Sequence, residues 1–322
     1  MIAPPKPGDK LDRFRIQALV ARSGMATIFR ALDTSDGMTV AIKVPHPEME
    51  CDPLFFDRFH REIDIGKKLN HPGVVKILEI ENPSRVYMAM EWAEGKPLRE
   101  ILDQQTKLTQ DEAVTIAVAT LDALGYIHKH GVVHRDLKPD NIMVDGDRIK
   151  LIDFGIAREA GSRRLTFGKL TKTMGTPDYV SPEQVKRKRG DARSDLYTFA
   201  VILFEMLTGQ LPFQAENPLA AMNQRLIVEP IPLRQLDPSL SPQLEEVLQR
   251  ALERNPERRY ATAEDFGHDL LNLDRVSVEE RVAVRAALRA EPPKMKWSWP
   301  YVALALVPVA IFALLLFVAR RK

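Results

Sequence analysis

The spacing of apolar residues divides most of the chain into a strand-rich stretch and a longer helix-rich stretch. Over residues 14–92, β-branched clusters such as residues 39–44 are separated by turn residues, which predicts a set of strands. One helix is expected among them, over residues 53–69, because apolar side chains recur there at every fourth position. From Gly95 onward the apolar residues follow a helical period, as in residues 114–127.

The strand pattern followed by the helical pattern predicts an α+β fold with two lobes. The sheet-rich lobe covers residues 14–93, the helix-rich lobe covers residues 94–273, and a ligand is expected to bind in the cleft between them. A very apolar helix is expected within the second lobe, over residues 196–207.

A third apolar stretch, residues 299–319, contains no charged side chain. At ~1.5 Å rise per residue it is long enough to cross a hydrocarbon layer of ~30 Å. Trp297, Trp299 and Tyr301 stand where an interfacial aromatic belt is expected. The pattern predicts a single C-terminal transmembrane helix. The rest of the chain then divides into a leader (1–13), a juxtamembrane linker (274–298) and a short tail (320–322).

Composition narrows the function classes. The 322 residues include 46 Lys and Arg against 44 Asp and Glu, a net charge of +2, so no global basic field favours nucleic-acid binding. A single cysteine, Cys51, excludes an internal disulfide framework and a cysteine-rich zinc module. It fits a reducing compartment, so we expect the two lobes to lie in the cytosol.

The chemistry is concentrated in two short motifs. Residues 134–141 read His-Arg-Asp-Leu-Lys-Pro-Asp-Asn, and residues 153–155 read Asp-Phe-Gly after a short strand-like stretch. These motifs resemble the catalytic and metal-binding loops of eukaryotic-like (Hanks-type) bacterial serine/threonine protein kinases. The resemblance extends over residues 14–273, roughly four-fifths of the chain. It implies a bilobal protein-kinase fold that uses ATP and Mg²⁺, with Mn²⁺ as a substitute, to phosphorylate proteins.

The resemblance assigns roles within these loops. Asp136 would accept the proton of the substrate hydroxyl or orient it, and Lys138 would place a positive charge on the γ-phosphate. Lys138 is also typical of serine/threonine rather than tyrosine kinases. Asn141 and Asp153 supply hard oxygen ligands of the kind that magnesium prefers.

The nucleotide site is implied in the same way. Lys43, in Val-Ala-Ile-Lys, would hold the α- and β-phosphates, with Glu62 as its ion-pair partner. Met90 would lie behind the adenine, with Glu91 and Ala93 offering hinge backbone. The other residues expected around ATP are Leu19, Val20, Ala21, Arg22, Ser23, Gly24, Met25, Ala26, Thr27, Ile28, Ala41 and Met143.

The glycine-rich loop departs from the family pattern. Ala21, Ser23 and Ala26 replace its three glycines, although Gly24 remains between them. Alanine or serine in left-handed geometry costs about 1 to 2 kcal/mol per residue, and a cost that arises only in the nucleotide-bound state would weaken ATP binding. Two interpretations follow, a working kinase with weaker nucleotide binding or a pseudokinase that binds partners without turnover. The retained charged residues favour the working enzyme.

A third interpretation is a small-molecule phosphotransferase on the same fold. Lys138 argues instead for protein substrates, as does Thr176, which by resemblance belongs to the substrate platform near Asp136.

The segment from residue 153 to residue 183 has few apolar anchors. In this family Arg135 receives a phosphate carried by that segment, so we expect activation by autophosphorylation at Thr171 or Thr173. The alternative is an exposed loop that is not modified.

Three further residues have structural roles by resemblance. Glu183 is expected to pair with Arg259 in a buried bridge, and Asp195 is expected to bind the backbone of the catalytic loop. The basic run over residues 186–189 fits a solvated loop, or a surface that attracts acidic substrates or anionic lipids.

The expected location is the inner or plasma membrane, with a single span. Five basic residues precede the span and three follow it, which favours a cytoplasmic N-terminal part only slightly. Dependence on ATP decides the orientation, because the nucleotide is cytosolic. The expected partners are protein substrates, the membrane, a second copy in a homodimer and a cognate phosphatase, with no nucleic acid.

Overall fold

A computed structural model describes residues 4–50, 52–153 and 177–279. The chain divides into two compact units, Met1–Val276 and Ser277–Lys322. The first unit contains both predicted lobes, and the description below concerns that unit.

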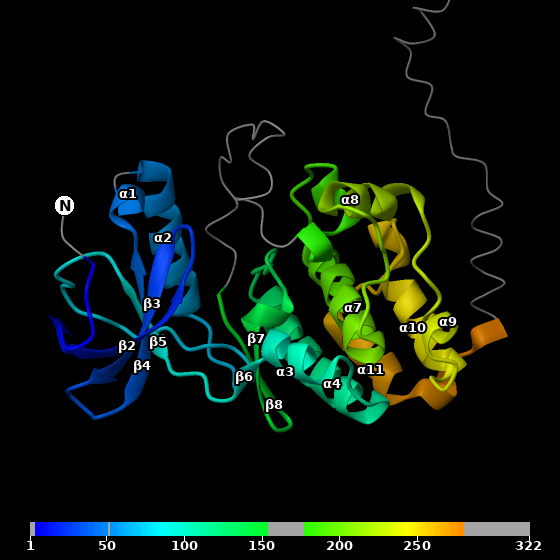
Figure 1. The fold of residues 1–322 in the computed structure, drawn as a ribbon, viewed down its shortest axis with the longest axis horizontal. Helices are drawn as coiled ribbons and strands as arrows, with labels where there is room; N and C mark the ends of the chain where they lie inside the picture. Colours follow the sequence, from blue (N-terminus) through cyan, green and yellow to red (C-terminus); the bar gives the residue numbers. More distant parts are fainter. Residues whose placement is uncertain (1–3, 51, 154–176, 280–322) are drawn as a thin grey trace, which may run out of the picture. The chain divides into compact units, whose positions relative to one another are not determined.

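The N-terminal lobe is a five-stranded antiparallel sheet with strand order β1-β2-β3-β4-β5, accompanied by helix α2 (Figure 1). Buried aromatic and β-branched side chains of β3 and β4, among them Phe29, Val40 and Ile42, belong to the core of this lobe. The elements are β1 (Lys10–Leu11), β2 (Phe14–Arg22), β3 (Ala26–Asp33), β4 (Thr39–Pro45), α1 (Pro47–Glu50), α2 (Pro53–Gly66) and β5 (Met88–Glu91).

Helix α2 ends three residues before the predicted limit at residue 69. Its buried face carries Phe55, Phe59 and Glu62, while Ile63, the next residue of the predicted every-fourth series, is half-buried. After Gly66 the backbone tightens, because Leu69 N donates to Gly66 O at 3.1 Å. Glycine is a poor helix former, and the helix stops there.

The C-terminal lobe is mainly helical, with α7 at its centre (Figure 1). Every α7 residue from Ser194 to Leu207 is buried, and α4 and α10 pack against it. The helices are α3 (Leu98–Gln105), α4 (Gln110–Lys129), α6 (Pro182–Val185), α7 (Ala192–Thr208), α8 (Pro218–Ile227), α9 (Leu233–Leu236), α10 (Pro242–Ala251) and α11 (Ala263–Leu271). A small sheet is formed by β6 (Lys96–Pro97), β7 (Ile142–Asp145) and β8 (Arg148–Leu151). The 3-10 turns are η1 (Pro139–Asn141), η4 (Pro177–Tyr179), η5 (Pro256–Arg258) and η6 (Leu273–Arg275).

Backbone hydrogen bonds join the two lobes along one segment. Val75 N donates to Leu151 O at 2.9 Å, and Leu151 N donates to Gly73 O at 2.8 Å, so the chain leaving α2 pairs with β8 of the helical lobe. The predicted two-lobed α+β fold is therefore confirmed. The pairing also holds the segment that follows α2 beside β8, the strand that precedes Asp153.

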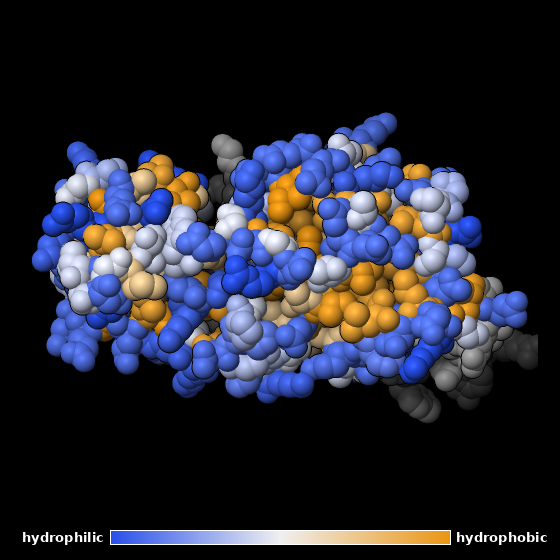
Figure 2. Space-filling view, turned by 90° about the horizontal axis from the view of Figure 1, so that it is seen from below, coloured by the Kyte–Doolittle hydropathy of each residue, from blue (hydrophilic) through white to orange (hydrophobic). Residues whose placement is uncertain are grey.

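Hydrophilic residues cover most of the face shown in Figure 2, and apolar residues gather on it over the helical lobe. Within the described ranges, no helix combines the length and apolar character that a membrane crossing requires. The span expected at residues 299–319 lies outside the described residues.

Candidate active site

The catalytic loop, residues 134–141, turns sharply between α4 and β7. Arg135 has a φ of 62°, a left-handed conformation that costs a non-glycine residue about 1 to 2 kcal/mol. Asp195, in the first turn of α7, offsets this cost, because its carboxylate accepts from His134 N at 2.7 Å and from Arg135 N at 2.8 Å. His128 Nε2 lies 2.8 Å from the same carboxylate. The turn presents Asp136, half-buried, directly after Arg135.

Asp195 is buried and charged. Burial alone would raise the pKa of its carboxyl, yet His128, His134 and the amide of Arg135 hold that pKa below its usual value. A carboxylate that accepts several hydrogen bonds in a dry environment is a rigid anchor. The role expected for Asp195 at the loop backbone matches the contacts that the structure gives it.

The two predicted metal ligands are neighbours. The amide of Asn141 donates to Asp136 O at 2.8 Å, and Ile152 N donates to Asn141 O at 3.0 Å, which brings Asp153 beside Asn141. Because the Asn141 nitrogen is engaged, its side-chain oxygen is the atom left for a cation. Asp153, at a φ of 61°, adds a carboxylate, so the donor set is hard oxygen and fits Mg²⁺.

Lys43 on β4 joins the two lobes electrostatically. Its Nζ lies 3.2 Å from Glu62 Oε1 on α2 and forms a second ion pair with Asp153. Burial alone would lower the pKa of Lys43, but Asp153 and Glu62 reverse this effect and raise it. Burial raises the pKa of the Glu62 carboxyl to about 7, although Lys43 opposes the shift. Glu62 Oε2 has no hydrogen-bond partner among the residues that the structure describes.

These motifs match one family over most of the chain, because residues 15–271 fit the model of the protein kinase domain. This chain belongs to the protein kinase family. The probable serine/threonine-protein kinase of Streptomyces coelicolor is 36% identical over 264 residues, which are 80% of this chain and 39% of that protein. PknB of Mycobacterium tuberculosis is 34% identical over 273 residues, 83% of this chain and 44% of PknB. The kinase pkn3 of Myxococcus xanthus is 35% identical over 305 residues, 89% of this chain and 56% of pkn3.

The described part is accordingly a serine/threonine protein kinase domain of the bacterial type. The chain spans between 39% and 56% of the length of these curated relatives. Among solved structures, the PknI kinase domain of Mycobacterium tuberculosis aligns with a TM-score of 0.66 at 24% identity, covering 84% of this chain and all of that domain. That likeness shows the fold alone.

The residues expected around the adenine lie on four strands, β3, β4, β5 and β7. Ala41 on β4 pairs with Met90 on β5, both are buried, and Ile28 on β3 pairs with Lys43. Met143 is half-buried on β7. Ile28, Ala41 and Met90 thus lie on paired strands beside Lys43, while Met143 lies on β7 of the small sheet in the helical lobe.

The hinge residue Glu91 has a contact that its sequence did not indicate. Its Oε1 accepts from Lys76 N at 2.8 Å and from Lys150 Nζ at 2.7 Å. The side chain therefore ties the hinge to β8 of the helical lobe, while Ala93 follows as half-buried backbone.

The degenerate glycine-rich loop closes as a short hairpin between β2 and β3. Ser23 Oγ accepts from Ala26 N at 3.1 Å, and Ser23 N donates to Ala26 O at 2.9 Å, so the serine itself holds the turn. At Ala21, Ser23 and Ala26, all described, φ is not positive, and Gly24 is not left-handed either. The strain expected of alanine and serine in left-handed geometry is therefore absent from this conformation.

The remaining residues expected at the nucleotide lie on the same hairpin. Leu19 and Val20 are exposed, while Thr27 is buried, with its hydroxyl 3.1 Å from His46 Nε2. Arg22 is exposed at the end of β2, and Met25 is half-buried in the turn.

The expected bridge between Glu183 and Arg259 is present and bidentate. Nη1 lies 2.7 Å from Oε1 and Nη2 lies 2.8 Å from Oε2. Ser194 donates to the same carboxylate at 2.6 Å. Burial alone would raise the pKa of Glu183, but Arg259 and Ser194 hold it below its usual value. Gln184, the next residue, donates to Arg135 O at 3.3 Å, which connects the bridge to the catalytic loop.

The end of the activation segment is anchored by residues that motif analysis missed. Tyr179 on η4 donates to Glu205 at 2.6 Å, and Arg99 on α3 donates to both, at 3.2 Å to Tyr179 and at 2.9 Å to Glu205. Arg225, fully buried on α8, donates to the carbonyl of Asp178. A glutamate within the very apolar α7 was the available signal for Glu205, because a charge there requires a partner. Thr171, Thr173 and Thr176 lie outside the described residues.

Proposed function

We propose that this protein is an ATP-dependent serine/threonine protein kinase that transfers the γ-phosphate of ATP to Ser and Thr hydroxyls of other proteins. The observation that carries the proposal is the joint arrangement of the Lys43–Glu62 pair, the Asp195-supported catalytic loop and the adjacent Asn141 and Asp153. Each group supplies the charge or the oxygen ligand that phosphoryl transfer requires at that place.

The reaction forms a bond between the substrate oxygen and the γ-phosphorus and breaks the bond from that phosphorus to the bridging oxygen of ADP. The left-handed turn at Arg135 holds Asp136 in place, and Asp136 takes the proton of the substrate hydroxyl. Lys138 faces charge that develops on the moving phosphoryl group, and Lys43 positions the phosphates that remain on ADP. A divalent cation, which we propose to be Mg²⁺, would be held by Asn141 and Asp153 and would neutralise phosphate charge.

Two observations support the working enzyme over a pseudokinase. The hairpin Ala21–Ala26 closes without left-handed strain, and Lys43 is already paired with Glu62. Lys138 in the catalytic loop and the anchored η4 that follows Thr176 favour protein acceptors over small molecules.

The full chain tests this proposal when it is incubated with Mg²⁺, ATP labelled at the γ-phosphate and an unfolded acceptor protein rich in Ser and Thr. We expect label on Ser and Thr that Asp136→Asn abolishes. Asp140→Asn is the matched control, because Asp140 is exposed in the same loop and should leave transfer unchanged. Absence of label with the natural chain, or equal label with Asp136→Asn, would sink the proposal.

We further propose activation by autophosphorylation at Thr171 or Thr173, read by Arg135, because a phosphate opposite an arginine forms charge-assisted hydrogen bonds that order a loop. A cognate phosphatase would reverse it, and a homodimer would allow one copy to phosphorylate another. Mass spectrometry after incubation with ATP should find phosphate on Thr171 or Thr173. An unmodified segment in an active preparation would contradict this step.

The proposed place of action is the inner or plasma membrane, with residues 299–319 as a single span and the kinase domain on the cytoplasmic side. Its support is the uncharged sequence and the need for cytosolic ATP. The full chain should remain in the membrane fraction after alkaline extraction. Leu306→Arg, which places a charge near mid-span at a cost of about 2.5–3.5 kcal/mol, should release it, and equal retention of both forms would contradict the anchor.

A further inference from the structure

His46 contacts the degenerate glycine-rich hairpin at two points. Its backbone N donates to Met25 O at 2.8 Å, one step beyond Ala26 and Pro45, the last residues that β3 and β4 pair at that end. Its ring Nε2 lies 3.1 Å from the hydroxyl of Thr27. The backbone contact extends the ladder of β3 and β4 into the turn, and the side-chain contact adds a second link to β3.

The side-chain contact lies on the face of the sheet opposite the candidate nucleotide site. Thr27 pairs with Val44, whereas Ile28 pairs with Lys43. Successive side chains of a strand point to opposite faces, so Thr27 shares the face of Val44 and not that of Lys43. Val44 belongs to the core of the N-terminal lobe. Thr27, expected at the nucleotide, therefore faces away from it, and its buried hydroxyl contacts His46 instead.

The backbone at His46 is rigid, because the residue stands between two prolines. Pro45 ends β4 and Pro47 begins α1. A residue that precedes proline is restricted to extended conformations, and the proline ring fixes its own φ. Met49 N also donates to His46 O at 2.8 Å, which joins the histidine to α1. If the ring and Thr27 separate, we therefore expect the hairpin to move rather than the histidine.

Order in the hairpin before binding affects affinity. A loop that becomes ordered only when its ligand binds lowers the affinity by the cost of that ordering. We propose that His46 is a positioning residue for the nucleotide, because its contact with Thr27 holds the hairpin closed in the free protein and so removes this cost when ATP binds. The inference rests on the proposed ATP-dependent activity.

His46→Ala in the full chain tests the proposal. The substitution removes the ring and leaves the backbone bond to Met25 in place. Loss of one hydrogen bond of ordinary strength should raise the dissociation constant of ADP and the KM for ATP by about 3- to 10-fold, while kcat stays unchanged. Isothermal titration calorimetry with ADP and Mg²⁺ measures the affinity without any phosphoryl transfer.

Two further variants separate this contact from general damage. His46→Gln keeps a side-chain amide that can reach the Thr27 hydroxyl, so it should restore the natural affinity. Thr27→Val keeps the shape of the side chain, removes the hydroxyl and should weaken ADP binding as His46→Ala does. The two losses should not add in the double variant, because both remove one contact. If His46→Ala does not fold, Thr27→Val carries the same test.

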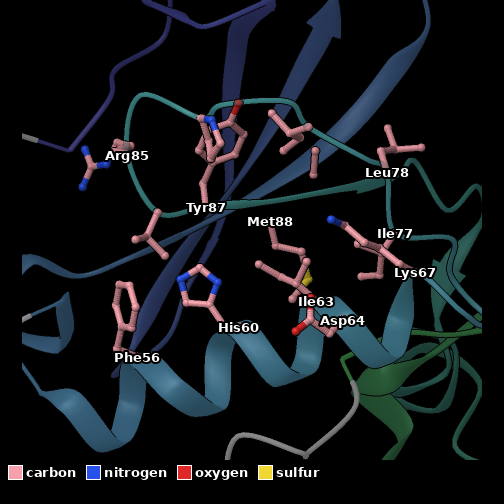
Figure 3. A pocket seen from close by; sticks show the side chains of 14 residues that line it. Phe56, His60, Ile63, Asp64, Lys67, Ile77, Leu78, Arg85, Tyr87 and Met88 are labelled. Atoms are coloured by element: carbon pink, nitrogen blue, oxygen red, sulfur yellow. The ribbon is translucent and has the colours of Figure 1, made fainter.

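His60→Ala is the matched control in the same lobe. Figure 3 shows His60 beside Phe56 on α2, and the centres of their rings are 4.4 Å apart. The two side chains line a pocket of about 410 Å³ whose walls come from residues 56–67 and 77–89. Removal of this exposed histidine should leave the affinity for ADP unchanged.

Hydrogen exchange without nucleotide supplies a readout that does not depend on kinase activity. Ser23 N donates to Ala26 O at 2.9 Å, and Ala26 N donates to Ser23 Oγ at 3.1 Å. Both amides should exchange faster in His46→Ala than in His60→Ala, because the hairpin opens more often.

The outcomes distinguish this inference from the proposed function. A natural chain that binds ADP but transfers no phosphate defeats the kinase proposal, while weaker ADP binding by His46→Ala would still support the positioning role. Unchanged affinity or unchanged hairpin exchange in His46→Ala overturns the inference. So does a His46→Gln variant that binds ADP no better than His46→Ala.

Discussion

Removal of the buried ion pair between Glu183 and Arg259 should cause a large loss of stability. The Arg259 side chain is 0% exposed, its Nη atoms lie 2.7 and 2.8 Å from the two oxygens of Glu183, and its guanidinium also donates to the carbonyls of Glu253, Arg193 and Arg254. Arg259→Met keeps an unbranched apolar stem, shorter than that of arginine, and removes all five donors. It leaves the Glu183 charge buried with one remaining hydroxyl donor, Ser194.

The expected cost is large compared with the stability of the domain. Removal of one partner of a buried pair costs about 3–5 kcal/mol, against a total unfolding free energy of about 5–15 kcal/mol. Urea unfolding followed by circular dichroism should therefore show a midpoint for Arg259→Met far below that of the natural chain, with an unchanged slope. Glu229→Gln, which breaks an exposed ion pair with Arg254, is the control and should cost about 1 kcal/mol or less.

A double variant completes the test. Glu183→Gln combined with Arg259→Met removes both charges, so its loss of unfolding free energy should be smaller than the sum of the two single losses. The reasoning is refuted if Arg259→Met costs no more than Glu229→Gln, or if the two losses simply add.

Three other predictions concern Asp195, Tyr179 and the dependence of stability on pH. Asp195→Ala removes the acceptor of the Arg135 amide and should lower kcat at least about tenfold in a folded protein, and an unchanged kcat measured beside an unchanged spectrum would contradict it. Tyr179→Phe removes the bond to Glu205 and should cost about 1–2 kcal/mol in urea unfolding while raising KM for the protein substrate but not for ATP, and a change in KM for ATP alone would argue against it. The pKa values of Glu183 and Asp195 are lowered by folding, so the stability that these carboxylates add is complete above their unfolded values of about 4 and is lost as the pH falls below them. Glu183→Gln should flatten that acid dependence, and an identical pH profile of the urea midpoint would count against the assignment.

Local motifs made much of the site predictable from the sequence. The catalytic loop and Asp153 lie close together in the sequence and match a motif of known order. The Lys43–Glu62 and Glu183–Arg259 contacts could be predicted because each of the four residues belongs to a motif of its own. A residue that must carry charge inside a core has few chemical substitutes, so its type and position remain visible in the sequence.

Contacts determined by packing between distant residues were not predictable in this way. Gly66 packs so closely against Ile77 that a Cβ atom on residue 66 would lie 2.3 Å from Cγ1 of Ile77. The sequence shows only a glycine in a helix and a separate apolar residue, and nothing in it indicates that the two are in contact. The same holds for Arg225, whose burial depends on how α8 meets η4. The closure of the glycine-rich loop was not predictable for a local reason, since the pattern does not show that Ser23 can close the hairpin with its own hydroxyl.

Measurement of phosphoryl transfer is the most direct test of whether this protein is a serine/threonine kinase that depends on Asp136. The full chain, Asp136→Asn and Asp140→Asn should be compared in one assay with Mg²⁺, labelled ATP and a mixture of protein and small hydroxyl acceptors, followed by analysis of the phosphorylated amino acids. We expect phosphoserine and phosphothreonine on protein, lost with Asp136→Asn and retained with Asp140→Asn. Label confined to small molecules, or protein label that does not depend on Asp136, would contradict it.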